Sequence, residues 1–129
     1  MENIIDTLRS IPDYIGSNGR TEKIILEAEL FLGVAFADDY RQYLEVIGLA
    51  CFDGHELTGL TDIIRLDVIS VTKEQRAINT NIPATWYVVE ETNIDGIIIW
   101  QDRMGRVYQA SPFGLPTKIA NSLLEYIKL

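Results

Sequence analysis

The residues with the greatest chemical potential in this sequence are carboxylates beside two segments that have the pattern of hairpin turns. Glu90 and Glu91 end a strand-like run, and Asp95 and Asp102 fall within or beside the turns that follow it. A pair of carboxyl groups across a cleft can perform acid–base chemistry, and retaining glycosidases place theirs about 5–5.5 Å apart. The spacing here does not indicate such a cleft, because charged residues that flank hairpins are normally solvated. A small acid–base enzyme therefore stands third among the functional hypotheses.

The other reactive side chains do not form a known catalytic or metal-binding motif. His55 is the only histidine and Cys51 is the only cysteine. His55-Glu56 does not begin a two-histidine zinc motif, because position 59 is glycine. The glycine-rich phosphate loops and the Gly-x-Ser-x-Gly nucleophile motif are also missing from the sequence. We therefore predict no catalytic residues, no metal site and no cofactor, with His55 in a solvated loop and Cys51 in the core.

Length and composition predict one globular domain that spans 1–129. The chain has 129 residues, of which 47% are hydrophobic and 23% are charged. Eleven Lys and Arg against nineteen Asp and Glu give a formal net charge of -8 at pH 7. Such an acidic chain does not neutralise phosphates, so direct binding of nucleic acid or of an anionic membrane is disfavoured, while a basic partner is allowed. With one cysteine and neither a signal-peptide pattern nor a membrane-spanning apolar run, we expect a cytoplasmic protein.

Helical periodicity dominates the first part of the chain. A short helix is predicted over 2–9. A second begins after Thr21, a suitable N-cap, and ends at Gly33. A third begins near position 38, where two aspartates complement the positive end of the helix dipole, and ends at Gly48.

The middle of the chain changes to a strand-like pattern. Residues 49–71 have the glycines and alternation of short strands and turns, and Thr72 with Gln75 forms a capping box for a short helix over 73–79. The strongest β signal is a three-stranded antiparallel meander. Its strands are predicted at 86–89, 97–100 and 107–108, with turns at 93–96 and 102–105.

The end of the chain is predicted to be helical from Pro116, which suits the first turn of a helix. Its apolar stripe is Ile119, Leu123, Tyr126 and Ile127. Helices that are separated in sequence from an antiparallel meander predict an α+β fold, with the helices packed on one side of the sheet.

Several motifs, taken in order, resemble the SUKH superfamily, which is named in part for a yeast cell-wall synthesis regulator. The first is a helix pair, Glu29-Leu30-Phe31-Leu32-Gly33-Val34 followed by Asp38-Asp39-Tyr40-Arg41-Gln42-Tyr43-Leu44. The others are 67–72 with Gln75-Arg76, 86–90 with 95–96, Asp102 with 105–108, and 119–127. Ala37 stands where the family usually has proline, and Gly48-Leu49 where it often has Asn-Gly. The resemblance extends over nearly the whole chain from about Thr21.

The resemblance implies an α+β fold and a role in protein binding. Bacterial members of the superfamily are mostly immunity proteins, or antitoxins. They neutralise the toxic C-terminal domain, often a nuclease, of a polymorphic or contact-dependent toxin. The superfamily has no agreed catalytic residues, so the resemblance assigns none here. The alternative implied by the eukaryotic members is a regulatory or scaffold module that binds a protein unrelated to toxins.

An acidic surface fits the role of nuclease inhibitor, because a nuclease needs a basic cleft to attract phosphate. The predicted contact residues are Glu90, Glu91, Asp95 and Asp102, with Trp100 as an anchor, and a second acidic cluster of Asp53, Glu56 and Asp62. Trp86 and Trp100 also have the pattern of residues that pack in a core or on a sheet face. The sequence leaves a monomer and a homodimer equally open, since an apolar strand edge or an exposed Trp100 would serve dimerisation as well as toxin binding.

Overall fold

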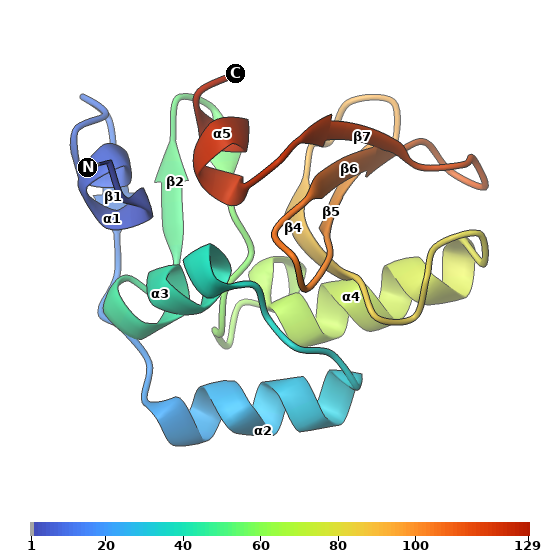
Figure 1. Cartoon of the computed structure of the whole chain (residues 1–129), viewed down its shortest axis with the longest axis horizontal. Helices are drawn as coiled ribbons and strands as arrows, with labels where there is room; N and C mark the ends of the chain where they lie inside the picture. Colours follow the sequence, from blue (N-terminus) through green and yellow to red (C-terminus); the bar gives the residue numbers. More distant parts are fainter. Residues whose placement is uncertain (1) are drawn as a thin grey trace.

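The computed structural model describes residues 2–129 and has the α+β fold that the sequence predicts. A three-stranded sheet and a four-stranded sheet lie side by side with the helices around them (Figure 1). The helices are α1 (Ile4–Arg9), α2 (Glu22–Leu32), α3 (Asp38–Val46), the 3-10 helix η1 (Ile64–Leu66), α4 (Val68–Ile78) and α5 (Leu123–Ile127). The strands are β1 (Ile15–Gly16), β2 (Ala50–Phe52), β3 (His55–Glu56), β4 (Tyr87–Glu91), β5 (Ile98–Gln101), β6 (Val107–Ala110) and β7 (Thr117–Ala120).

The N-terminal helices begin and end at the predicted signals. Thr21 Oγ1 accepts a hydrogen bond from the backbone N–H of Ile24 at the start of α2. Gly33 ends α2 in the left-handed conformation, with φ of 69°, and donates its N–H to Glu29. In α3, Tyr40, Tyr43 and Leu44 are buried, as their spacing predicts. These helices contribute Ile25, Ala28 and Leu32 of α2 and Tyr40, Tyr43 and Leu44 of α3 to the larger core cluster.

The prediction for the segment before the meander is confirmed for the helix over 73–78 but places its start too late, because 68–72 are helical as well. Residues 68–78 form the helix α4, and Asp67 is its N-cap. The carboxylate of Asp67 accepts hydrogen bonds from both the N–H and the hydroxyl of Ser70. Thr72, predicted as the N-cap, lies inside α4, where its hydroxyl accepts a hydrogen bond of 3.0 Å from the N–H of Val88. The buried residues Val68, Val71 and Thr72 have helical spacing, and their β-branched side chains gave the segment the composition of a strand.

The C-terminal prediction is also wrong in its first half. Residues 117–120 form β7, which pairs with β6 and makes the meander four-stranded. The helix α5 begins only after Ser122, whose Oγ accepts the N–H of Glu125 at 3.0 Å. Ile119 therefore belongs to a strand, because pairing with β6 satisfies backbone groups that a free helix end would leave to solvent.

Both faces of the four-stranded sheet are covered, so the expectation of helices on one side is wrong. Val88 and Trp100 are cross-strand neighbours, and they pack with Val71 of α4 on one face. Tyr87 and Val89 belong to the larger cluster that is shared with α1, α3 and α5. In Figure 1 α4 runs beneath this sheet, whereas α5 lies between the two sheets. The sheet is therefore the central layer of the fold.

A cluster of aromatic side chains occupies the centre of the larger core. Tyr40, Tyr43 and Tyr87 are fully buried, and the ring centroids of Tyr40 and Tyr87 are 5.1 Å apart. The hydroxyl of Tyr43 donates to the carbonyl oxygen of Thr58 at 3.0 Å, and that of Tyr87 donates to Gln101 Oε1 at 2.6 Å. Burial raises the pKa of each of these phenols, because an apolar environment disfavours the phenolate.

Among residues 2–129, no helix has the length and apolar character that a membrane crossing requires.

Candidate functional site

Three of the residues predicted as partner contacts are buried. Trp100 is 1% exposed, Glu90 2% and Asp102 5%. Trp100 packs in the second core cluster, which confirms the alternative prediction that it is a core residue. These side chains are not presented at the surface, so neither toxin contact nor dimerisation through Trp100 is supported by their positions.

Glu90 holds the two sheets and α5 together. Its carboxylate oxygens both lie 3.0 Å from His55 Nδ1, and one accepts the backbone N–H of Glu56 at 3.2 Å. The other accepts a hydrogen bond from the hydroxyl of Tyr126 in α5. His55 itself lies in β3 and stacks on Phe52, so the prediction of a solvated loop residue is wrong. The buried carboxylate of Glu90 thus links β3, β4 and α5 through its hydrogen bonds.

Replacing Glu90 with glutamine is expected to lower the free energy of unfolding by about 2 kcal/mol, because charged acceptors form the stronger hydrogen bonds and the amide NH₂ faces donors. Urea denaturation measures the change. Glu91→Gln is the matched control, since Glu91 is the next residue in β4 and its side chain is only half-buried. Equal stability of the E90Q protein and the parent would show that this carboxylate is not a structural link.

Asp102 closes the turn between β5 and β6. Its Oδ1 accepts the backbone N–H groups of Met104 and Arg106, and its Oδ2 accepts Arg106 Nε at 2.8 Å and the hydroxyl of Tyr108 at 2.9 Å. Asp95 is exposed in the predicted turn between β4 and β5, where it adopts a left-handed conformation with φ of 54°. Asp95 is therefore a surface residue, whereas Asp102 is buried.

Three of the remaining predicted acids, Asp53, Glu56 and Glu91, line hollows around the outer face of the three-stranded sheet. Here Ile15, Cys51 and Glu56 are cross-strand neighbours on β1, β2 and β3. They line two adjoining hollows of about 510 Å³ and about 140 Å³. Glu56 also borders a third hollow that reaches Glu91 of β4. We call these three hollows together the acidic groove. Its lining residues are Asp13, Ile15, Gly16, Leu49, Ala50, Cys51, Phe52, Asp53, Gly54, His55, Glu56, Thr58, Arg65, Leu66, Glu91 and Asn93.

One ion pair organises the acidic end of the groove. The guanidinium of Arg65 donates to both carboxylate oxygens of Glu56, at 2.9 Å and 3.0 Å. This contact lowers the pKa of Glu56. Burial and the charge of Glu74 raise the pKa of Glu91, which has no such direct ion pair. The groove therefore keeps an excess of negative charge that Arg65 only partly neutralises.

At the other end of the groove, Asp13 fixes the turn between β2 and β3. Both oxygens of its carboxylate lie 2.9 Å from the backbone N–H of Asp53. Asp53 and Gly54 have φ of 46° and 79°, the left-handed pair that a two-residue hairpin of type I′ requires. The backbone thus holds Asp53 rigidly at the rim of the groove.

The sequence identified only part of this site. It identified Asp53, Glu56 and Glu91 as acidic candidates, but it gave no signal that Asp13 and Ile15 lie beside them, because strand pairing over about forty residues creates that proximity. The prediction that Cys51 is a core residue is wrong, since Cys51 is partly exposed in the groove.

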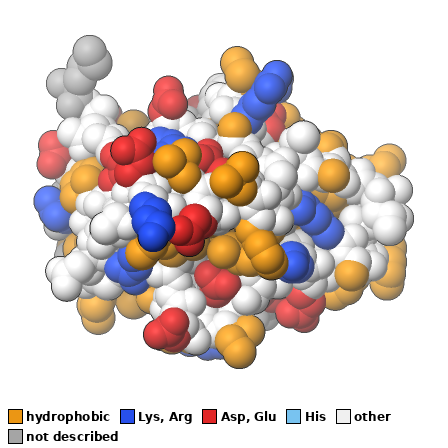
Figure 2. All heavy atoms as spheres, turned by 90° about the horizontal axis from the view of Figure 1, so that it is seen from below, with side chains coloured by type: hydrophobic (Ala, Val, Ile, Leu, Met, Phe, Trp, Pro, Cys, Tyr) orange, Lys and Arg blue, Asp and Glu red, His pale blue; other side chains and the backbone are white. Residues whose placement is uncertain are grey.

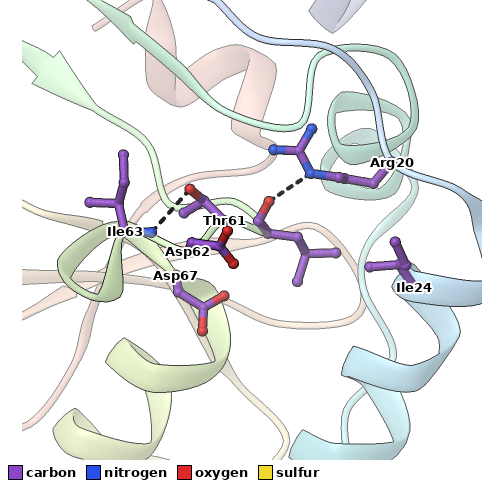
Figure 3. Close-up of a pocket in the computed structure, with 7 residues that line it drawn as sticks. Arg20, Ile24, Thr61, Asp62, Ile63 and Asp67 are labelled. Carbon is purple, nitrogen blue, oxygen red and sulfur yellow. Dashed lines mark hydrogen bonds between the residues drawn. The ribbon is translucent and has the colours of Figure 1, made fainter.

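Asp62 lies in a separate hollow of about 590 Å³ between the start of α2 and the 60–67 segment. Figure 3 shows Asp62 beside Asp67, with Arg20 and Ile24 across the hollow. Arg20 Nε donates to the carbonyl oxygen of Leu60 at 2.7 Å, and Asp67 caps α4. Two of the charged groups here thus have structural partners, and the hollow shares no lining residue with the acidic groove.

The described residues form no metal centre, and the lower face of the molecule carries both positive and negative charges (Figure 2). Within the described part of the chain, no group of three or more His, Cys, Asp or Glu side chains is arranged to hold a metal ion. The lower face of the molecule, seen in Figure 2, carries both signs of charge interspersed with apolar side chains. Between α2 and α4, Lys73 Nζ lies 3.8 Å from the centroid of the Phe31 ring.

Comparisons with known proteins agree with this architecture. A crystal structure of a protein from Pseudomonas syringae pv. tomato is similar, with a TM-score of 0.75 and 14% sequence identity over 96% of this chain and 92% of that one. This similarity concerns the fold. The search of curated proteins gives no match. The family model SUKH_5, described as SMI1-KNR4 cell-wall, matches residues 1–128. The chain therefore belongs to the SMI1-KNR4 cell-wall family, as the order of its motifs indicates.

Proposed function

We propose that this protein is a cytoplasmic immunity protein that binds the toxic C-terminal domain of a cognate toxin, a nuclease, and thereby blocks its active cleft. The observation that carries the proposal is an acidic groove on the open surface of a SUKH-family fold. Bacterial members of the SUKH superfamily, which this chain resembles, are mostly immunity proteins.

The charge of the molecule supports binding to a basic enzyme. A net charge of -8 accelerates encounter with a positive cleft, and carboxylates placed there compete with the phosphates of the substrate. Asp53 is exposed and Glu91 is half-buried in the groove, so both are placed for such contacts, whereas Glu90 and Asp102 are engaged inside the fold. In this proposal the acidic groove binds the toxin domain, and the protein acts by stoichiometric binding without converting a substrate.

Co-purification with the toxin domain encoded beside its gene tests the function. We expect a one-to-one complex whose affinity falls with added salt, and growth of cells that express both proteins. An unrelated basic protein of similar charge is the control and is expected not to be retained at physiological salt. Absence of a complex together with absence of rescue would refute the proposal. A neighbouring gene of signalling or cell-wall synthesis would favour the regulatory module instead.

A further inference from the structure

We propose that the apolar floor of the acidic groove is the anchor point for the partner, and that it accepts an extended segment with one apolar side chain between lysines or arginines. The floor consists of Ile15, Leu49, Cys51 and Leu66. This inference rests on the proposed function and names the surface that carries it out.

The floor is apolar although it lies at the surface. Ile15 is 68% exposed, and it stands beside Cys51 across the β1–β2 ladder. The hollow that these residues form with Leu49 and Leu66 is about 140 Å³. Interfaces are anchored where a side chain enters a hollow that loses its water on binding, and the surrounding contacts exclude solvent. The floor thus has the size and chemistry to receive one aliphatic or aromatic side chain.

Charge complementarity determines what flanks that side chain. Asp13, Asp53 and Glu56 line the larger hollow beside the floor, and Glu56 and Glu91 line the third hollow. Arg65 is the only lysine or arginine among the lining residues, and Glu56 already binds it. A segment with lysines or arginines on either side of its apolar residue matches this rim, whereas an acidic peptide or a nucleic acid is repelled.

The topology favours an extended segment. β1 is the outer strand of the sheet ordered β1-β2-β3, so in the described part of the chain no second strand pairs with its outer edge, and an extended segment is the form that such an edge recognises. The rim beside β1 is positioned before binding, because the carboxylate of Asp13 accepts a hydrogen bond from the backbone N–H of Asp53. A preformed rim lowers the entropy that binding would otherwise lose.

Substitution of Ile15 tests the floor, with the full chain and the toxin domain of the co-purification experiment. Ile15→Glu is expected to raise the dissociation constant by about 100-fold, which is the effect of losing one buried anchor. Leu115→Glu is the matched control, since Leu115 is 77% exposed in the loop between β6 and β7, and its affinity is expected to stay unchanged. Both side chains are exposed, so thermal unfolding of each variant is expected to match the parent.

Asp53→Asn tests the rim, because asparagine tolerates the same backbone conformation and removes only the charge. We expect slower association at low salt and a smaller effect of added salt.

The single cysteine gives an independent measurement of occupancy. Cys51 lines the floor, and its alkylation by a maleimide is expected to slow at least about tenfold in the complex because the anchor covers the thiol. A chain with Cys51→Ser and Leu115→Cys is the control, and its thiol is expected to react equally fast free and bound. A complex that forms normally with I15E and leaves Cys51 reactive would overturn the groove while the proposed function stands. No complex with the parent chain would end both.

Discussion

Stability is expected to fall steeply as the pH rises above 10, until the protein unfolds cooperatively. Tyr40, Tyr43, Tyr87 and Tyr126 all have a pKa raised above the ordinary value of 10.0, chiefly through burial. Below pH 10 the phenols are protonated in both states, so they leave stability unchanged. Between 10 and the raised values, the folded state holds protons that the unfolded state has released. Each phenol then lowers the free energy of unfolding by up to about 1.4 kcal/mol per pH unit.

With four such phenols the combined slope approaches about 5 kcal/mol per pH unit, which exhausts a typical stability of about 5–15 kcal/mol within one to three pH units. Phenolate absorbance and circular dichroism, recorded together during an alkaline titration, measure the effect. The two signals are expected to change in one transition. Tyr43→Phe is expected to reduce the slope by about one quarter, because it removes one titrating group. Gradual phenolate formation in a protein that stays folded would contradict the prediction.

Truncation of Trp100 is expected to cause the largest loss of stability among the former interface candidates. Trp100→Ala should lower the free energy of unfolding by about 4 kcal/mol, since it leaves a cavity among Val71, Ile82 and Val88. The midpoint of thermal unfolding should fall by roughly 15 °C. Differential scanning calorimetry measures both quantities.

The second tryptophan provides the control for this variant. Trp86 is half-buried and stacks on Tyr108 with ring centroids 3.9 Å apart, so Trp86→Ala is expected to lose only about 1.5 kcal/mol. If Trp100→Ala kept the stability of the parent but lost partner binding, Trp100 would be an interface residue in a conformation different from this one.

The sequence predicts elements well where a local signal is strong and poorly where packing decides. Thr21 and Gly33 are cap residues, and the asparagine and glycine of the 93–96 turn adopt the left-handed conformations that such residues permit. The start of α4 was missed because Thr72 resembles an N-cap, yet its hydroxyl bonds to Val88. β7 was missed because its partner strand, β6, supplies the reason for its conformation.

The candidate site follows the same rule. The acids Asp53, Glu56 and Glu91 could be identified by type, whereas their arrangement around Ile15 depends on the pairing of β1 with β2. Burial of Glu90 also could not be read locally, because its partners His55 and Tyr126 come from β3 and α5.

The separation between buried and exposed carboxylates has an evolutionary consequence. Glu90 and Asp102 bear the hydrogen bonds that keep the fold intact, and substitution there is costly. The side chains of Asp53 and Glu91 do not bear those hydrogen bonds, so Glu91 tolerates substitution, and Asp53 tolerates asparagine, which suits its left-handed backbone. Exposed positions of the groove can therefore change one at a time while the folded state keeps its stability.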